Sequence, residues 1–252
     1  MKLKYLLFIA SLTVLVTTCK KDSKIDLGFD EKRYVYKDDC KQDQCVEVNL
    51  DYIQCVGNVM VSEKINLAIN EFIISSLNYN MDEVISTPTI ENAVNKFMEA
   101  YKKDKSEFPE ISPYFAEINV TNTYRSEKMI CLEMKQYLYT GGAHGYGSVW
   151  YLNVDLQSGE ELSTYDLLNN VDHFKNYAER VFREKLEVPE GGSINATGFW
   201  FDEDEFYLPE TIGFQDSNLI LLYNPYDIAS YADGAIEIDI PIKEIESYLK
   251  VK

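Results

Sequence analysis

The sequence predicts an α+β fold with a largely antiparallel sheet, about three helices packed on it, and two intertwined lobes. Strand-like and helix-like segments come in blocks rather than in strict alternation, which disfavours a parallel α/β sheet. Apolar residues make up 46% of the 252 residues, enough for a packed core. The chain has no internal repeat and no low-complexity tract, which argues against a solenoid.

The N-terminus has the pattern of an export signal. Lys2 and Lys4 precede an apolar run, residues 5–16, which is too short to span a bilayer. The sequence Val16-Thr17-Thr18-Cys19 then resembles a lipobox, in which the cysteine is acylated. An ordinary secretory signal with a cysteine at its boundary is the alternative.

This pattern predicts a lipoprotein signal peptide at 1–18 and a polar tether at 19–32. The protein would be extracytoplasmic and held at the cell membrane or outer membrane only through acylated Cys19.

Removal of residues 1–18 would leave 22 basic and 42 acidic residues, a formal charge of −20. Such a charge makes nucleic acid an implausible partner. It would attract cationic proteins, unless its only effect is on solubility.

Four cysteines follow Cys19, an even number in a chain predicted to be exported. We expect two disulfides, with Cys40 paired to Cys45 and Cys55 to Cys131. A zinc site is the weaker interpretation, because the spacings are not those of paired CxxC motifs.

In the first half of the chain, alternating side chains predict strands at 34–36 and 46–50. Two helices follow, one capped by Ser62 and running to Leu77, and one starting at Pro88. Their apolar stripes are interpreted as core rather than as a ligand surface.

In the second half, a turn at 157–160 closes a hairpin into a segment that ends at Leu168. Asp172 is expected to cap a third helix. A continuous apolar run at 219–223 is typical of a central strand. The remaining elements are strands at 114–123, 129–139, 149–156 and 236–240, and a short terminal helix within 242–249.

A glycine-dense segment at 137–147 sits between two of these strands and carries four of the 12 glycines. Four glycines in seven positions predict a tight loop or a close approach of backbone. His144 lies inside it, either bonding its own hairpin or serving a function. His173, near the start of the third helix, is interpreted as a surface or capping residue.

No recognisable catalytic constellation accompanies either histidine, so an enzyme is not expected. The acidic cluster at 202–205 is interpreted as a solvated loop, since adjacent carboxylates define neither a glycosidase cleft nor a calcium loop. Neither a metal nor a cofactor is expected.

Several separated motifs resemble one family, the paired domains of unknown function of the RsiV/PdaC type. Domains of this type are found in a lysozyme-sensing anti-sigma factor and ahead of the catalytic domain of a peptidoglycan deacetylase. The motifs are Tyr139-Thr140-Gly141-Gly142-Ala143-His144, Asn153-Val154-Asp155-Leu156 with Gly159, Asp166-Leu167, Asn224-Pro225-Tyr226-Asp227-Ile228 with Tyr231 and Gly234, and Ile238-Asp239-Ile240-Pro241.

This resemblance implies two domains of the family, at 33–147 and 148–252, and an extracytoplasmic binding module. The expected partner is a lysozyme-like muramidase or a peptidoglycan fragment of the cell wall. Deacetylase activity is not implied, because that chemistry belongs to a separate domain. A glycan-acting hydrolase of the cell envelope that uses His144 or the acids near Asp202 is the alternative.

The candidate ligand surface combines the glycine loop with the segment 224–231. Flat tyrosine faces suit sugars or an enzyme cleft, while glycine and proline limit the ordering cost of binding. The alternative is that these tyrosines only pack on one another. The candidate residues are Tyr139, Gly141, Gly142, His144, Tyr146, Pro225, Tyr226 and Tyr231.

Overall fold

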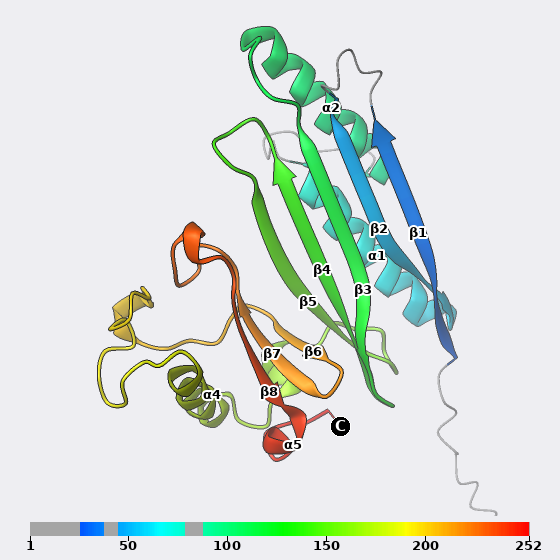
Figure 1. Ribbon diagram of the computed structural model, residues 1–252. Helices are drawn as coiled ribbons and strands as arrows, with labels where there is room; N and C mark the ends of the chain where they lie inside the picture. The colour runs from blue at the N-terminus through cyan, green and yellow to red at the C-terminus, as the bar shows by residue number, and fades with distance from the viewer. Residues whose placement is uncertain (1–25, 38–44, 79–87, 252) are drawn as a thin grey trace, which may run out of the picture.

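The fold is α+β, as the sequence predicts, and consists of two sheets with their helices (Figure 1). The computed structural model describes residues 26–37, 45–78 and 88–251. Within these ranges the chain forms eight strands, in one five-stranded and one three-stranded sheet, and five α-helices. None of the described helices is both long enough and apolar enough to cross a membrane. The predicted signal peptide and Cys19 lie outside the described residues.

The five-stranded sheet has the strand order β1-β2-β3-β4-β5 and is antiparallel except where β2 runs parallel to β3. A parallel pair needs a long crossover, and two helices supply it here. In Figure 1 both helices lie on one face of the sheet. The strands are β1 (Leu27–Lys37), β2 (Glu47–Gly57), β3 (Phe115–Arg125), β4 (Met129–Tyr139) and β5 (Tyr146–Asp155), and the helices are α1 (Val59–Leu77) and α2 (Ile90–Glu107).

Strand β1 begins earlier than the sequence predicts. Residues 27–32, expected to be part of a tether, pair with β2 from Leu27↔Gly57 onward. Asp26 also accepts a hydrogen bond from the Asn58 backbone at 2.9 Å, which ties the strand to the start of α1. Backbone hydrogen bonds to β2 therefore hold this polar segment in the sheet, although its side chains alone predict a linker.

Helix starts differ from the predictions by a few residues. Asn58, not Ser62, caps α1, and its side chain accepts from the Val61 N–H at 3.2 Å. Helix α2 is capped by Thr89, one residue after Pro88. Helix α4 is capped by Asn170 rather than Asp172. In each case a nearby Asn or Thr has the non-helical backbone that a cap requires, and the expected residue lies beside the cap or in the first turn.

The three-stranded sheet has the order β6-β7-β8, with the apolar run predicted as a central strand in its middle. Helices that precede the sheet in the sequence and one that follows it pack against it (Figure 1). The strands are β6 (Ile212–Gln215), β7 (Asn218–Tyr223) and β8 (Ile236–Pro241), the helices are α3 (Thr164–Leu167), α4 (Val171–Lys185) and α5 (Ile242–Ile245), and two 3-10 turns are η1 (Asp202–Asp204) and η2 (Tyr231–Asp233).

The large sheet is buried on both faces along part of its length. One face packs against α1 and α2, and side chains such as Ile130 and Leu132 belong to this core. The opposite face of the same strands contributes Met129, Cys131 and Tyr151 to a second core with β6–β8 and α4. The two lobes therefore share strands β4 and β5. The predicted boundary between residues 147 and 148 falls inside β5.

The predicted disulfide between Cys55 and Cys131 is wrong, because both are buried free thiols. Cys55 belongs to the core under α1, whereas Cys131 belongs to the core under the three-stranded sheet. Strand β3 also lies between their strands, which places the two backbones roughly 9–10 Å apart, beyond the reach of a disulfide. Cys45 is not among the free thiols, and its predicted partner Cys40 lies outside the described residues, so that pairing stays a prediction.

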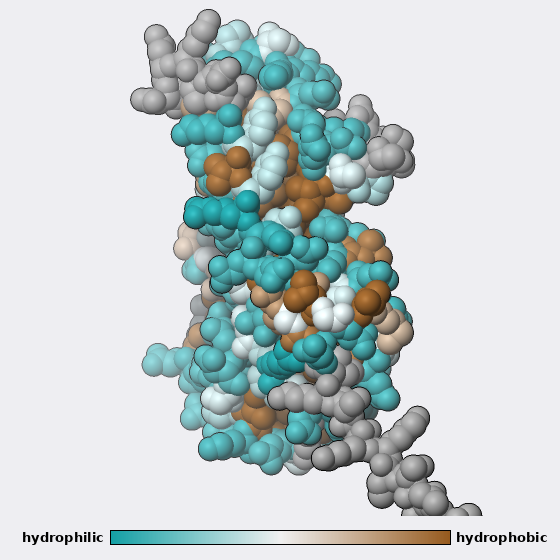
Figure 2. Space-filling view, turned by 90° about the vertical axis from the view of Figure 1, so that its right-hand side faces the viewer, coloured by the Kyte–Doolittle hydropathy of each residue, from teal (hydrophilic) through white to brown (hydrophobic). Residues whose placement is uncertain are grey.

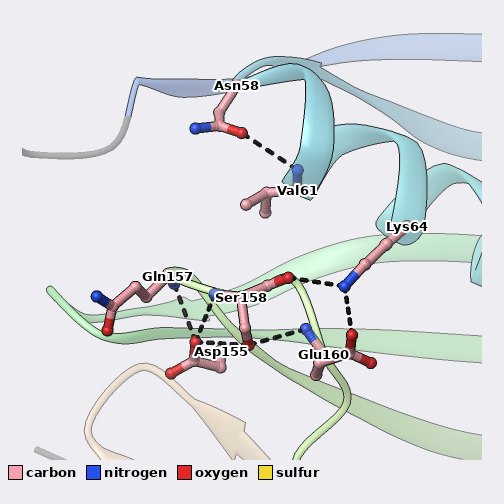
Figure 3. A network of polar contacts seen from close by, with 7 residues as sticks. All are labelled: Asn58, Val61, Lys64, Asp155, Gln157, Ser158 and Glu160. Carbon is pink, nitrogen blue, oxygen red and sulfur yellow. Dashed lines mark hydrogen bonds and ion pairs between the residues drawn. The ribbon is translucent and has the colours of Figure 1, made fainter.

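The turn at 157–160 is present and joins β5 to α3 (Figure 3). One Asp155 carboxylate oxygen accepts from the Gln157 N–H at 3.0 Å and from the Ser158 N–H at 2.7 Å. Lys64 of α1 donates to the Ser158 carbonyl at 2.9 Å and pairs with Glu160, so the turn is attached to the helix layer. The second strand of the predicted hairpin is reduced to a single β-bridge, Val154↔Glu161. The segment ending at Leu168 is the short helix α3 instead of a longer strand.

The β1 side of the molecule is largely hydrophilic. Figure 2 shows this side with its apolar side chains in small separate patches. Exposed apolar residues of the described chain include Val35, Val59 and Met60, which are 54%, 67% and 52% exposed. Patches of this size are ordinary on a soluble surface and do not by themselves indicate an interface.

Candidate functional site

The glycine loop forms a tight connection between β4 and β5, as predicted. Gly141 has φ +83°, and a Cβ there would lie 2.4 Å from the Ile111 side chain. A Cβ on Gly145 would lie 2.3 Å from the Tyr137 hydroxyl and 2.8 Å from the Leu138 carbonyl oxygen. These two positions therefore require glycine, one for its backbone angle and both for space. Gly142 has no such close neighbour.

The loop meets the segment 224–231, which is about 80 residues later in the chain. The Tyr231 hydroxyl donates to the Gly145 carbonyl at 2.7 Å. The rings of His144 and Tyr231 stack with centroids 3.8 Å apart and planes at 22°. His144 Nδ1 also lies 2.9 Å from the Gly145 carbonyl oxygen. His144 thus bonds its own hairpin and packs on Tyr231 at the same time.

Tyr226 and Tyr146 form the exposed part of this cluster. Tyr226 is 52% exposed and its ring centroid lies 5.7 Å from that of Tyr231. Its φ is +77°, an uncommon value for a residue with a side chain. Tyr146 is 38% exposed and its hydroxyl lies 3.5 Å from the Pro225 carbonyl oxygen. Burial, and then the charge of Asp227, raise the pKa of the Tyr146 phenol.

The structure therefore brings most of the candidate ligand residues together. His144 and Tyr226 both lie against Tyr231, Tyr146 contacts Pro225, and Gly141 and Gly142 belong to the loop that carries His144 and Tyr146. Tyr139 ends β4 opposite Phe115, and among the described residues the ring contacts of the cluster do not include it. We refer to the residues 139–146 and 224–231 together as the tyrosine surface.

Asn224 attaches the second segment to β5, a role that the sequence did not reveal. Its side-chain Oδ1 accepts from the Val149 N–H at 2.8 Å, and its Nδ2 donates to the Val149 carbonyl at 3.1 Å. The side-chain amide thus occupies the place of a neighbouring strand at the edge of the sheet. The Asn224 N–H donates in turn to the Asp227 carboxylate at 2.7 Å. An Asn-Pro pair after an apolar strand indicates a turn but not this contact.

A shallow groove of about 310 Å³ adjoins the tyrosine surface on the open face of β3–β5. Tyr137 and Lys135 line it from β4, Asn119 from β3, and Asn224 and Pro225 from the later segment. Aromatic, amide and ammonium groups together can hold a polar partner by stacking and hydrogen bonds.

The other candidates are apart from this surface. His173 is exposed in the first turn of α4, in agreement with a surface position, and its backbone N–H donates to the side chain of Asn170, the residue that caps the helix. The acidic cluster at 202–205 is exposed, and its Asp204 accepts from the Ser193 hydroxyl at 2.5 Å. Among the described residues there is no group of three or more His, Cys, Asp or Glu side chains that could hold a metal ion.

The described chain forms an α+β fold with two cores that share strands β4 and β5, and comparisons with known proteins match it in two successive segments. The family described as Deacetylase PdaC matches residues 40–146. The family described as a protein of unknown function (DUF3298) matches residues 164–243. The chain therefore matches these two families in tandem, in agreement with the resemblance to paired RsiV/PdaC-type domains.

Solved structures show the same fold. A DUF3298 family protein from Bacteroides fragilis has 18% sequence identity, a TM-score of 0.70, and a match covering 90% of this chain and 94% of its own. A second, from Pseudomonas aeruginosa, has 18% identity, a TM-score of 0.63, and a match covering 90% and 96%. A search of curated proteins gives no match. At this identity the similarity establishes the fold, and the DUF3298 description assigns no activity.

Proposed function

We propose that this chain is a lipid-anchored, extracytoplasmic binding protein whose tyrosine surface holds a cationic, lysozyme-like muramidase without turnover. The observation that carries the proposal is the meeting of two distant segments, the glycine loop and residues 224–231, in one exposed aromatic cluster. Exposed tyrosines on a pre-organised backbone are typical of binding surfaces, because they contribute large contact areas at low conformational cost.

The contacts of His144 favour binding over catalysis. Its Nδ1 faces the Gly145 carbonyl and its ring is stacked on Tyr231. A general base would instead need a nucleophile within hydrogen-bond reach on one side and an orienting acid on the other.

The charge of the chain favours a cationic partner over a neutral glycan. The full sequence has a formal charge of −18, and −20 once residues 1–18 are removed. A field of this sign accelerates association with basic proteins and does little for an uncharged sugar. The on-rate should therefore fall as salt increases, because added ions screen the field.

The anchor is a separate part of the proposal and rests on the sequence 1–19. Labelling of expressing cells with a fatty-acid analogue should mark the wild type and leave Cys19→Ala unmarked. An unlabelled wild-type protein would remove the anchor from the proposal while leaving the binding function to be tested independently.

The binding experiment uses the soluble chain from residue 20 onward and a purified c-type lysozyme as the probe. We expect Tyr226→Ala and His144→Ala each to weaken the affinity by about tenfold or more, as loss of an aromatic anchor does. Tyr165→Ala is the matched control, since Tyr165 lies on α3 and is 72% exposed. All variants must retain the wild-type melting temperature.

Three results would contradict the proposal in different ways. If both variants bind lysozyme with the affinity of the wild type, the tyrosine surface is not the binding site. Binding of peptidoglycan fragments in place of lysozyme would reassign the ligand to a glycan. Cleavage of the glycan by the wild type, lost in His144→Ala, would instead favour the hydrolase.

A further inference from the structure

A second groove, of about 460 Å³, lies between the C-terminal half of α1 and strands β4 and β5. It is on the helix-covered side of the sheet and shares none of the candidate residues of the tyrosine surface. Its volume is in the range of small-molecule sites in proteins. The groove is therefore a candidate ligand site separate from the tyrosine surface.

The charged side chains that line this groove are both acidic. Glu71 comes from α1 and Glu161 from the segment that follows the β5 turn, and no Lys or Arg is among the described residues that line the groove. Neither carboxylate forms an ion pair with another described residue, whereas the neighbouring Glu160 is paired with Lys64. Two unpaired carboxylates facing one cavity favour a positively charged ligand.

The uncharged polar groups add further hydrogen-bond acceptors. Ser75 and Ser76 both donate their hydroxyl protons to the Phe72 carbonyl, at 2.9 and 2.7 Å, so the oxygen lone pairs remain available to a ligand. These residues lie in the last turn of α1, which has no basic side chain. No basic side chain of this turn therefore offsets the negative end of the helix dipole, which adds to the attraction of the groove for a cation.

Apolar faces line the same cavity. Phe72 and Trp150 are half-buried and Met134 is almost fully buried at its base. An aromatic face packs against the C–H side of a sugar ring, and it attracts an ammonium group placed over it.

We propose that this groove binds a glycan that carries free primary amino groups. An ammonium group offers three hydrogen-bond donors and a positive charge, which match the acceptor excess of Glu71, Glu161 and the serines. The sugar ring supplies the apolar face for Trp150 and the hydroxyls for Gln136 and Thr211, which also line the groove. Gln136 already donates to the Ser148 hydroxyl at 2.9 Å and Thr211 accepts from the Tyr151 N–H at 3.1 Å, so each keeps only part of its hydrogen-bonding capacity for a ligand. Sugar hydroxyls can use this remaining capacity, whereas a lysine side chain would satisfy the carboxylates and offers no hydroxyl.

The test uses a β-1,4-linked glucosamine tetramer as the probe, with its fully N-acetylated form as the neutral control. Binding is followed by tryptophan fluorescence in a Trp200→Phe background, because Trp150 and Trp200 are the two tryptophans of the chain. At physiological salt and mildly acidic pH we expect the amine form to bind about tenfold or more tightly than the acetylated form.

Glu71→Gln and Glu161→Gln should each reduce this preference about fivefold or more. Glu63→Gln is the matched control, because Glu63 is exposed on α1 outside the groove and removes the same charge from the acidic chain. Tyr226→Ala should have no effect, so that failure of this inference and failure of the proposed function are distinguishable.

Equal binding of the two tetramers would overturn the proposal, since it means that the amino groups contribute nothing to recognition. Equal loss in Glu63→Gln and in the groove variants would also overturn it, since it means that only the overall charge attracts the probe. Stronger binding of a lysine-containing peptide than of the glucosamine tetramer would also overturn it and assign the groove to a protein ligand.

Discussion

Asn224 pairs with the backbone of Val149 through two hydrogen bonds, one accepted from the N–H at 2.8 Å and one donated to the carbonyl at 3.1 Å. The two residues are 75 positions apart, and the contact attaches the tyrosine surface to the edge strand of the large sheet. The position of Pro225 and Tyr226 therefore depends in part on this one side-chain amide.

Replacement of Asn224 by alanine should lower the free energy of unfolding by about 1–3 kcal/mol, because the Val149 backbone loses both partners in a partly buried position. Thermal unfolding measures the effect. Asn176→Ala, at an exposed position on α4, is the control and should leave the melting temperature nearly unchanged. Equal melting temperatures for the two variants would mean that the paired amide contributes nothing.

Two glycines of the same loop should respond differently to alanine. In Gly145→Ala the new methyl group would overlap Tyr137 and the Leu138 carbonyl, so we expect a loss of about 1–3 kcal/mol. In Gly142→Ala the nearest atom to the methyl group is 3.9 Å away and the backbone is ordinary, so the change should be within about 0.5 kcal/mol. Chemical denaturation of both variants checks the difference, and a more harmful Gly142→Ala would contradict the loop geometry.

Asp155→Ala should destabilise the turn between β5 and α3 by about 1–2 kcal/mol, since it leaves the Gln157 and Ser158 N–H groups without their acceptor. Asp155→Asn retains an acceptor oxygen and should cost less. Lys64→Met removes an exposed ion pair and should change the stability by less than about 1 kcal/mol. Denaturation midpoints of the three variants should follow this order.

The stability of the protein should fall between about pH 9 and pH 11, in part through Cys131. Burial raises the pKa of this thiol to about 11, from an ordinary value of 9.0. Below pH 9 the thiol is protonated in the folded and the unfolded chain, so it makes no difference to stability. Above pH 9 the unfolded chain loses its proton first and is favoured, by up to about 1.4 kcal/mol per pH unit.

The pH slope of unfolding should be smaller in Cys131→Ala than in the wild type over this range. Burial also raises the pKa of Cys55 to about 11. We therefore expect both thiols to resist alkylation at neutral pH in the native chain and to react after unfolding. Rapid alkylation of the two thiols under native conditions would contradict their burial in two separate cores. Failure to detect two free thiols after unfolding without reductant would contradict it as well.

Patterning determined the element types well, because apolar spacing reports directly which side of a strand or helix is buried. The run at 219–223 is the central strand β7, and the stripes of α1, α2 and α4 are core. The cap positions were less certain, since Asn58 and Asn170 lie close to other residues that can serve as caps.

The sequence by itself determined the α+β class, the tight glycine loop and, through its motifs, the resemblance to paired domains of the RsiV/PdaC type. Only the tertiary structure decided which residues meet across the sheet. The even number of cysteines in a chain predicted to be exported suggested a disulfide between Cys55 and Cys131. Strands β2 and β4 instead place these two side chains in different cores. The same holds for Asn224 and Val149 and for Glu71 and Glu161, because strand order and crossover, not local propensity, determine which distant residues become neighbours.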